Sequence, residues 1–264
     1  MTDKRIDNPT QPPSTVRGIL AGQWRAIAWG GGATLAVELA IFIAARLTGA
    51  GMANALVASL AVATIWIIIA APVLAAGGRD WLAAALRAGV MADATGAFLL
   101  VVWVYGLAAG DVPGRLSFLG VLKLYVIFAT MCLVAVALVS MAASQGRRYV
   151  LAMVCVMAML MLAATPFWMN GLLKAAPSGA AGDLTTAAVT FNPVYSVMLA
   201  VLPDTGIVWH LSPNVMYHLT RIGEYNAPAP VAWYDWVWRF GAIAATGGGI
   251  GVILRRLVPP RAGG

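Results

Sequence analysis

The sequence predicts an all-α, polytopic membrane protein of about six transmembrane helices. Hydrophobic residues make up 61% of the 264 positions and charged residues only 10%, which leaves too few polar residues to cover a soluble globule. The mean hydropathy is +0.83. A helix needs roughly 20 residues to cross the hydrocarbon of a bilayer, and six apolar segments reach that length. None shows the strict alternation of a transmembrane β-barrel.

The predicted spans follow one another from residue 26 onward. In chain order they are residues 26–47, 53–76, 89–108, 118–141, 150–172 and 236–254. Residues 1–25 form a predicted cytoplasmic segment, in which Ser14 and Thr15 can cap an amphipathic helix over 16–24 that lies on the membrane surface. Residues 26–264 form the predicted six-span domain, with an outer loop region at about 173–235.

This outer region is too long for a simple link between packed helices and should have structure of its own. The Pro-Ser-Gly-Ala-Ala-Gly stretch at 177–182 predicts a flexible loop, and residues 184–202 are apolar but interrupted at Asn192 and Pro193. The interruption favours short re-entrant or interfacial helices over a seventh span. Aromatic residues then mark the outer interface: Trp233, Tyr234, Trp236 and Trp238.

The distribution of Lys and Arg predicts the orientation. One side of the predicted membrane carries Lys4, Arg5, Arg17, Arg25, Arg79, Arg87, Arg147, Arg148, Arg255, Arg256 and Arg261, and the other carries Arg46, Arg115, Lys123, Lys174, Arg221 and Arg239. The first set is larger, so we expect a multi-pass protein of the cell (inner) membrane with both termini cytoplasmic. The net charge of +7 then reflects topology in the lipid bilayer, and no nucleic acid partner is expected.

Two acidic residues lie inside predicted spans, where ionisable groups are costly. Glu38 is near the middle of the first span and should face the bundle or a water-filled cavity. Asp93 is about a turn inside the third span, near the cytoplasmic edge, where Arg87 or Arg79 could pair with it. Each is either a packing residue or a lining group of a substrate path or subunit interface.

A short helix-prone piece, residues 79–87, follows two glycines after the second span. Its Arg79, Asp80, Trp81 and Arg87 form either a docking surface for a cytoplasmic partner or a turn whose arginines only anchor the orientation. Arg147 and Arg148 are interpreted as a positive-inside turn.

No catalytic, metal or cofactor site is predicted. His210 and His218 are the only histidines, and their spacing falls short of a metal or haem site. The chain has no HExxH, CxxC or phosphate-binding GxxxxGK[ST] motif, so ATP hydrolysis by the P-loop mechanism would require another subunit. Cys132 and Cys155 lie in apolar runs and are expected to be packing residues.

The layout resembles the type-2 ABC-exporter permease family, whose members pair with separate ATP-binding-cassette ATPases. The resemblance covers most of the chain. It rests on the surface helix at 16–24, the cytoplasmic piece at 79–87, the fourth-to-fifth span passage ALVSMAASQGRRYVLAMVCVMAMLMLAATPFWMNGL, and the outer FNPVYSVMLAVLP before the last span. It implies small re-entrant helices at 191–203, an ABC ATPase subunit docked through the first helix and 79–87, and a second permease copy or a homologous permease as partner.

Two other functions stay open at this stage. A secondary transporter could use Glu38 or Asp93 as a proton-coupled site, although no inverted repeat is detectable. A membrane anchor of a redox enzyme would normally ligate haem through histidines in its spans, and the predicted spans contain none.

Overall fold

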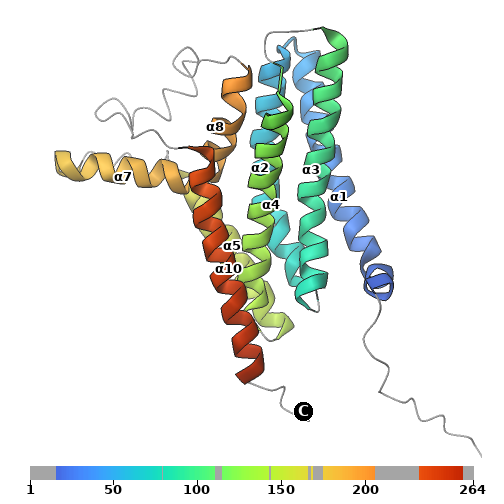
Figure 1. The fold of residues 1–264 in the computed structure, drawn as a ribbon, viewed down its shortest axis with the longest axis vertical. Helices are drawn as coiled ribbons and strands as arrows, with labels where there is room; N and C mark the ends of the chain where they lie inside the picture. The colour runs from blue at the N-terminus through green and yellow to red at the C-terminus, as the bar shows by residue number, and fades with distance from the viewer. Residues whose placement is uncertain are drawn as a thin grey trace, which may run out of the picture.

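A computed structural model describes residues 16–78, 80–110, 115–142, 144–165, 168, 175–205 and 232–257 of the chain. These residues form α-helices, with no β-strand among them (Figure 1). The helices are α1 (Val16–Leu47), α2 (Met52–Ala76), α3 (Trp81–Ala109), α4 (Phe118–Ser140), α5 (Gln145–Ala163), α7 (Ser178–Phe191), α8 (Pro193–Thr205) and α10 (Trp233–Leu257). The predicted all-α fold is confirmed.

Five helices of the described part are long and apolar enough to cross a membrane. They are Gln23–Leu47 of α1 and the whole of α2, α3, α4 and α5. A membrane-embedded, multi-span protein is therefore confirmed. α10 covers the range of the predicted sixth span but is not among these five helices. The sixth span remains a prediction.

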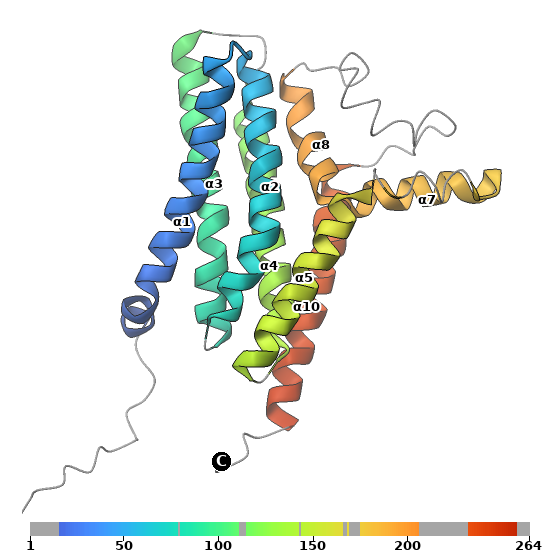
Figure 2. The ribbon, with the colours of Figure 1, turned by 180° about the vertical axis from the view of Figure 1, so that it is seen from behind.

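The long helices alternate in direction (Figures 1 and 2). α1, α3 and α5 begin at what we call the lower end of the bundle, where α2, α4 and α10 end. The opposite end is called the upper end. α4 lies in the middle and packs against α2, α3, α5, α8 and α10. The segments predicted to be cytoplasmic thus meet at one end, the lower one.

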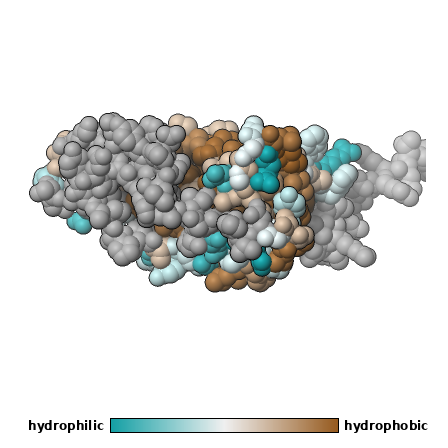
Figure 3. Space-filling model, turned by 90° about the horizontal axis from the view of Figure 1, so that it is seen from above, coloured by the Kyte–Doolittle hydropathy of each residue, from teal (hydrophilic) through white to brown (hydrophobic). Residues whose placement is uncertain are grey.

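The outer sides of the bundle are apolar, as lipid contact requires. Seen from the upper end, hydrophobic residues extend along the flanks of the described part (Figure 3). Val101 and Val104 of α3 and Met157 of α5 are exposed on such sides, whereas Leu124 and Phe128 of α4 are fully buried. The same apolar composition therefore serves both the core and the lipid-facing surface.

α1 includes the predicted surface helix, but as one continuous helix with the first span. Its first turns point in a different direction from the rest of α1 (Figures 1 and 2). Above the bend, small residues let α1 approach its neighbours: a Cβ on Gly30 would lie 2.9 Å from Leu74 Cδ1 of α2, and one on Gly31 would lie 2.9 Å from Val90 Cγ2 of α3. Such close approach is typical of packed membrane helices.

The α4–α5 turn is tied to the end of α2 at the lower end of the bundle. Arg148 is only 5% exposed; its Nε donates to the carbonyl of Ala142 at 3.2 Å and its Nη1 to the carbonyl of Gly78. Gln145 Nε2 donates to the carbonyl of Ala76 at 2.6 Å. These carbonyls lie at helix ends, where intrahelical donors run out. Arg148 is therefore a structural cap, whereas the neighbouring Arg147 is exposed.

α7 and α8 are separate helices that meet at Asn192, which confirms the predicted interruption. The Asn192 amide donates to the carbonyl of Ala163 at 3.2 Å and to Thr165 Oγ1 at 3.0 Å, and its Oδ1 accepts from the backbone N–H of Tyr195 at 3.0 Å. Asn192 thus caps α8 and ties it to the end of α5. α7 extends outward from the bundle, while α8 runs along it (Figure 1).

The predicted flexible loop at 177–182 is wrong, because α7 begins at Ser178. Pro177 precedes the helix as its N-cap, and the following alanines have the highest helix propensity of any residue. The glycines that suggested a loop are thus tolerated within a helix. That α7 and α8 are re-entrant stays a prediction.

The far end of α8 is joined to the start of α4 at the upper end. Asp204 Oδ2 accepts from the backbone N–H of Ser117 at 3.0 Å and from Ser117 Oγ at 2.5 Å. Ser117 Oγ in turn accepts from the N–H of Gly120 at 2.9 Å. A carboxylate at this place satisfies free N–H groups and interacts favourably with the positive end of the α4 dipole.

Candidate functional site

Glu38 lies at a junction of three helices. It is 0% exposed on α1, and Thr95 Oγ1 of α3 donates to its Oε1 at 2.5 Å. Ser59 Oγ of α2 donates to the Glu38 backbone carbonyl at 2.8 Å. The carboxyl group therefore faces the bundle, as the sequence predicts, where the Thr95 hydroxyl holds it, while the Ser59 hydroxyl holds the Glu38 backbone.

The second carboxyl oxygen of Glu38 is unsatisfied. Oε2 is buried and has no hydrogen-bond partner. No Lys or Arg forms an ion pair with Glu38 within the described ranges, so no counter-charge offsets the burial of this group. A buried polar atom without a partner is costly, and such atoms mark either strain or a functional group.

Further polar contacts follow one turn toward the lower end of α1. Trp66 Nε1 of α2 donates to Thr34 Oγ1 at 3.1 Å, and Thr34 Oγ1 donates to the carbonyl of Gly30 at 2.8 Å. Together with Ser59 and Glu38, these groups form a polar seam between α1 and α2. This seam lies inside an otherwise apolar helix pair.

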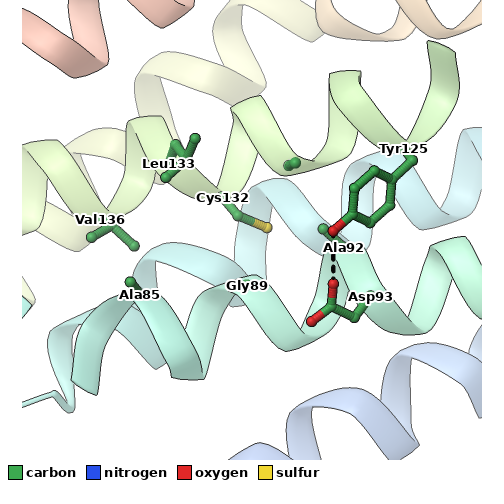
Figure 4. A pocket seen from close by; sticks show the side chains of 9 residues that line it. Ala85, Gly89, Ala92, Asp93, Tyr125, Cys132, Leu133 and Val136 are labelled. Atoms are coloured by element: carbon green, nitrogen blue, oxygen red, sulfur yellow. Dashed lines mark hydrogen bonds between the residues drawn. The ribbon is translucent and has the colours of Figure 1, made fainter. Parts of the chain in front are cut away.

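Asp93 lies elsewhere, in a groove between α3 and α4 (Figure 4). The groove has a volume of about 180 Å³ and is lined by Ala85, Gly89, Ala92, Asp93, Tyr125, Ala129, Cys132, Leu133 and Val136. The Tyr125 hydroxyl donates to Asp93 Oδ1 at 2.9 Å. Asp93 itself is exposed. A phenol of α4 and a carboxylate of α3 therefore make a hydrogen bond across this groove.

The expected position of Asp93 needs correction. α3 begins at Trp81, so at 1.5 Å per residue Asp93 lies about 18 Å from one end of the helix and about 24 Å from the other. It is thus near the middle of α3 and away from its edge. Asp93 forms no ion pair with Arg87, and Arg79 lies outside the described residues. The Tyr125 hydroxyl takes the place expected of an arginine.

The predicted helix-prone piece at 79–87 is helical over 81–87, where it forms the first turns of α3 and is continuous with the predicted third span. Asp80 is the N-cap of α3, and its Oδ1 accepts from the N–H of Ala83 at 2.7 Å. Trp81 is 47% exposed. The guanidinium of Arg87 lies against Gly77, where no side chain would fit. Of the expected docking residues that the structure describes, Trp81 presents a large exposed side chain and Asp80 has a capping role, whereas Arg79 lies outside the described residues.

The sequence does not predict the contacts that several polar residues make at these places. These residues are Ser59, Thr95, Tyr125, Arg148, Asn192 and Asp204. Cys132 and Cys155 are buried free cysteines, as expected of packing residues. Within the described residues, no three His, Cys, Asp or Glu side chains are grouped to hold a metal. His210 and His218 lie outside those residues.

Comparison with known protein families, with curated proteins and with solved structures finds no match for this chain. The resemblance drawn from its layout therefore stays a prediction.

Proposed function

We propose that this chain is the membrane-spanning permease subunit of an ATP-driven exporter, energised by a separate ATPase chain and similar to type-2 ABC-exporter permeases. The proposal includes a location in the cell (inner) membrane, both termini in the cytoplasm, and a second permease copy as partner.

The order of the helices carries this proposal. The bent first helix is the first of five apolar helices, and a broken pair, α7 and α8, comes before the last helix. The bent start of α1 and the exposed Trp81 at the start of α3 both belong to the lower end. These are the two places at which the resembling family docks its ATPase, so a single partner at the lower end could engage both.

Large aromatic side chains often supply most of the binding energy when they fill a partner's pocket. We therefore expect Trp81→Ala to weaken association with an ATPase by about thirtyfold, which corresponds to roughly 2 kcal/mol. The measurement is co-purification of the ATPase from native membranes, with ATP-dependent transport in parallel.

The control is Trp238→Ala, because Trp238 is similarly exposed, at 57%, but belongs to α10 near its beginning. A general loss of lipid anchoring would affect both variants, whereas loss of a docking contact affects only Trp81→Ala. A wild-type chain that purifies without any ATPase and transports on an ion gradient alone would remove the proposal.

A second candidate, a proton-coupled transporter, is favoured by one observation: the unsatisfied Oε2 of the fully buried Glu38. An intramembrane carboxyl without a counter-ion is the type of group that proton-driven carriers use. In that case Glu38→Gln, which keeps the shape and removes the titratable group, should abolish uptake driven by an imposed proton gradient in proteoliposomes without ATPase. Unchanged uptake would return Glu38 to a packing role.

A further inference from the structure

We propose that the groove between α3 and α4 binds a lipophilic organic cation. The cationic group would lie at the Asp93 carboxylate, and the apolar body would lie along the small residues of the groove. Binding at this groove is independent of how transport is energised, so it goes beyond the function proposed above.

The charge of Asp93 is the first argument. The residue is exposed and lies near the middle of a membrane-crossing helix, where a carboxylate that faces lipid is strongly unfavourable. Tyr125 supplies one hydrogen bond, and no Lys or Arg of the described ranges forms an ion pair with Asp93. A cation from outside the chain would neutralise the carboxylate.

The shape of the groove is the second argument. Ala85, Gly89 and Ala92 of α3 and Ala129 of α4 line the groove, and these small side chains leave it open between the two helices (Figure 4). The Tyr125 ring stands beside Asp93 at the same place, and aromatic rings attract quaternary ammonium groups. An alkylammonium matches both features, with its head at Asp93 and Tyr125 and its chain toward Leu133 and Val136.

The charge of the groove selects a free amphiphile over a membrane phospholipid as the occupant. The amine of a phospholipid lies next to a phosphate, and the described residues that line the groove include Asp93 but no Lys or Arg that would receive this phosphate. A single-chain alkylammonium brings the positive charge alone.

The probe is octyltrimethylammonium, measured by equilibrium dialysis against the full chain in a nonionic detergent. Its neutral isostere, 2,2-dimethyldecane, has carbon in place of the ammonium nitrogen and the same shape. We expect saturable binding of the cation and at least about tenfold weaker binding of the isostere. Asp93→Asn, which keeps the size of the side chain, should lower affinity for the cation by at least about tenfold.

A second variant tests the shape without touching the charge. A Cβ on Gly89 would meet nothing within 4 Å, and Gly89 lines the groove, so we expect the longer side chain of Gly89→Leu to extend into it. The matched control is Gly32→Leu, because Gly32 of α1 is exposed and equally free of neighbours. We expect Gly89→Leu to abolish binding and Gly32→Leu to leave it unchanged, with thermal unfolding showing that both variants are folded.

Three results would overturn the proposal. The first is wild-type affinity in Asp93→Asn or in Gly89→Leu. The second is equal affinity for the cation and its isostere. The third is displacement of the probe by phosphatidylethanolamine at equal mole fraction, which would assign the groove to a lipid headgroup instead.

Discussion

Replacing Arg148 by methionine would remove a guanidinium that joins the ends of two helices, while keeping a side chain of similar length. Arg148 is 5% exposed and donates to the carbonyls of Ala142 and Gly78. A hydrogen bond from a charged donor contributes about 1.5–3 kcal/mol, so two such bonds correspond to about 3–6 kcal/mol. Water can reach helix ends at the lower end of the bundle and replace part of this bonding. We therefore expect a loss near the lower limit, about 3 kcal/mol.

The matched control is Arg147→Met. Arg147 is the exposed neighbour and belongs to the same turn, so both variants remove one positive charge from the same side of the membrane. In detergent, Arg148→Met should lower the midpoint of thermal unfolding by about 6–12 °C, whereas Arg147→Met should leave it nearly unchanged. Arg148→Lys should recover only part of the loss, because its ammonium keeps the positive charge but lacks the planar fork that reaches two carbonyls. Equal shifts in Arg147→Met and Arg148→Met would refute the capping role.

Two further predictions concern the polar junction and the orientation. Thr95→Val leaves Oε1 of Glu38 without its donor and should reduce the free energy of unfolding by about 1–3 kcal/mol in detergent. The control Thr130→Val loses only a hydrogen bond to the Val126 carbonyl of its own helix and should reduce it less. Equal reductions in the two variants would contradict the role of Thr95 in holding Glu38. A reporter fused after Arg256 should stay cytoplasmic, and a cysteine at Ser178 should react with an impermeant reagent from outside; the inverse pattern would invert the topology.

The first five spans could be predicted from the sequence because their signal is local. A run of about 20 apolar residues is typical of a membrane-spanning helix. Pro193, which follows Asn192, has no backbone N–H to donate within a helix, so it interrupts the helix whatever surrounds it. The errors have a local cause too. Glycines at 178–182 suggested a loop, but neighbouring alanines favour the helix, and Asp80 starts α3 earlier than the apolar run does.

The acidic residues of the candidate sites could be predicted from the sequence, but their hydrogen-bond partners could not. Glu38 and Asp93 stand out because acidic residues in apolar runs are rare. Their partners do not stand out, since Thr95 and Tyr125 resemble every other hydroxyl-bearing residue in a span. Glu38 and Thr95 are 57 positions apart, and Asp93 and Tyr125 are 32 apart. Which residues meet over such distances depends on how the helices rotate and pack, and no single segment contains that information.

The contact between Ser117 and Asp204 sets an order of events during synthesis. The two residues are 87 positions apart, which at 5–20 residues per second amounts to about 4–17 s of translation. During that time α4 and α5 are made while the backbone N–H of Ser117 lacks its carboxylate. The upper end of the bundle is therefore completed only after the last residues of α8 have left the ribosome, and a chain released before that point would keep its first five helices but leave the start of α4 without this anchor.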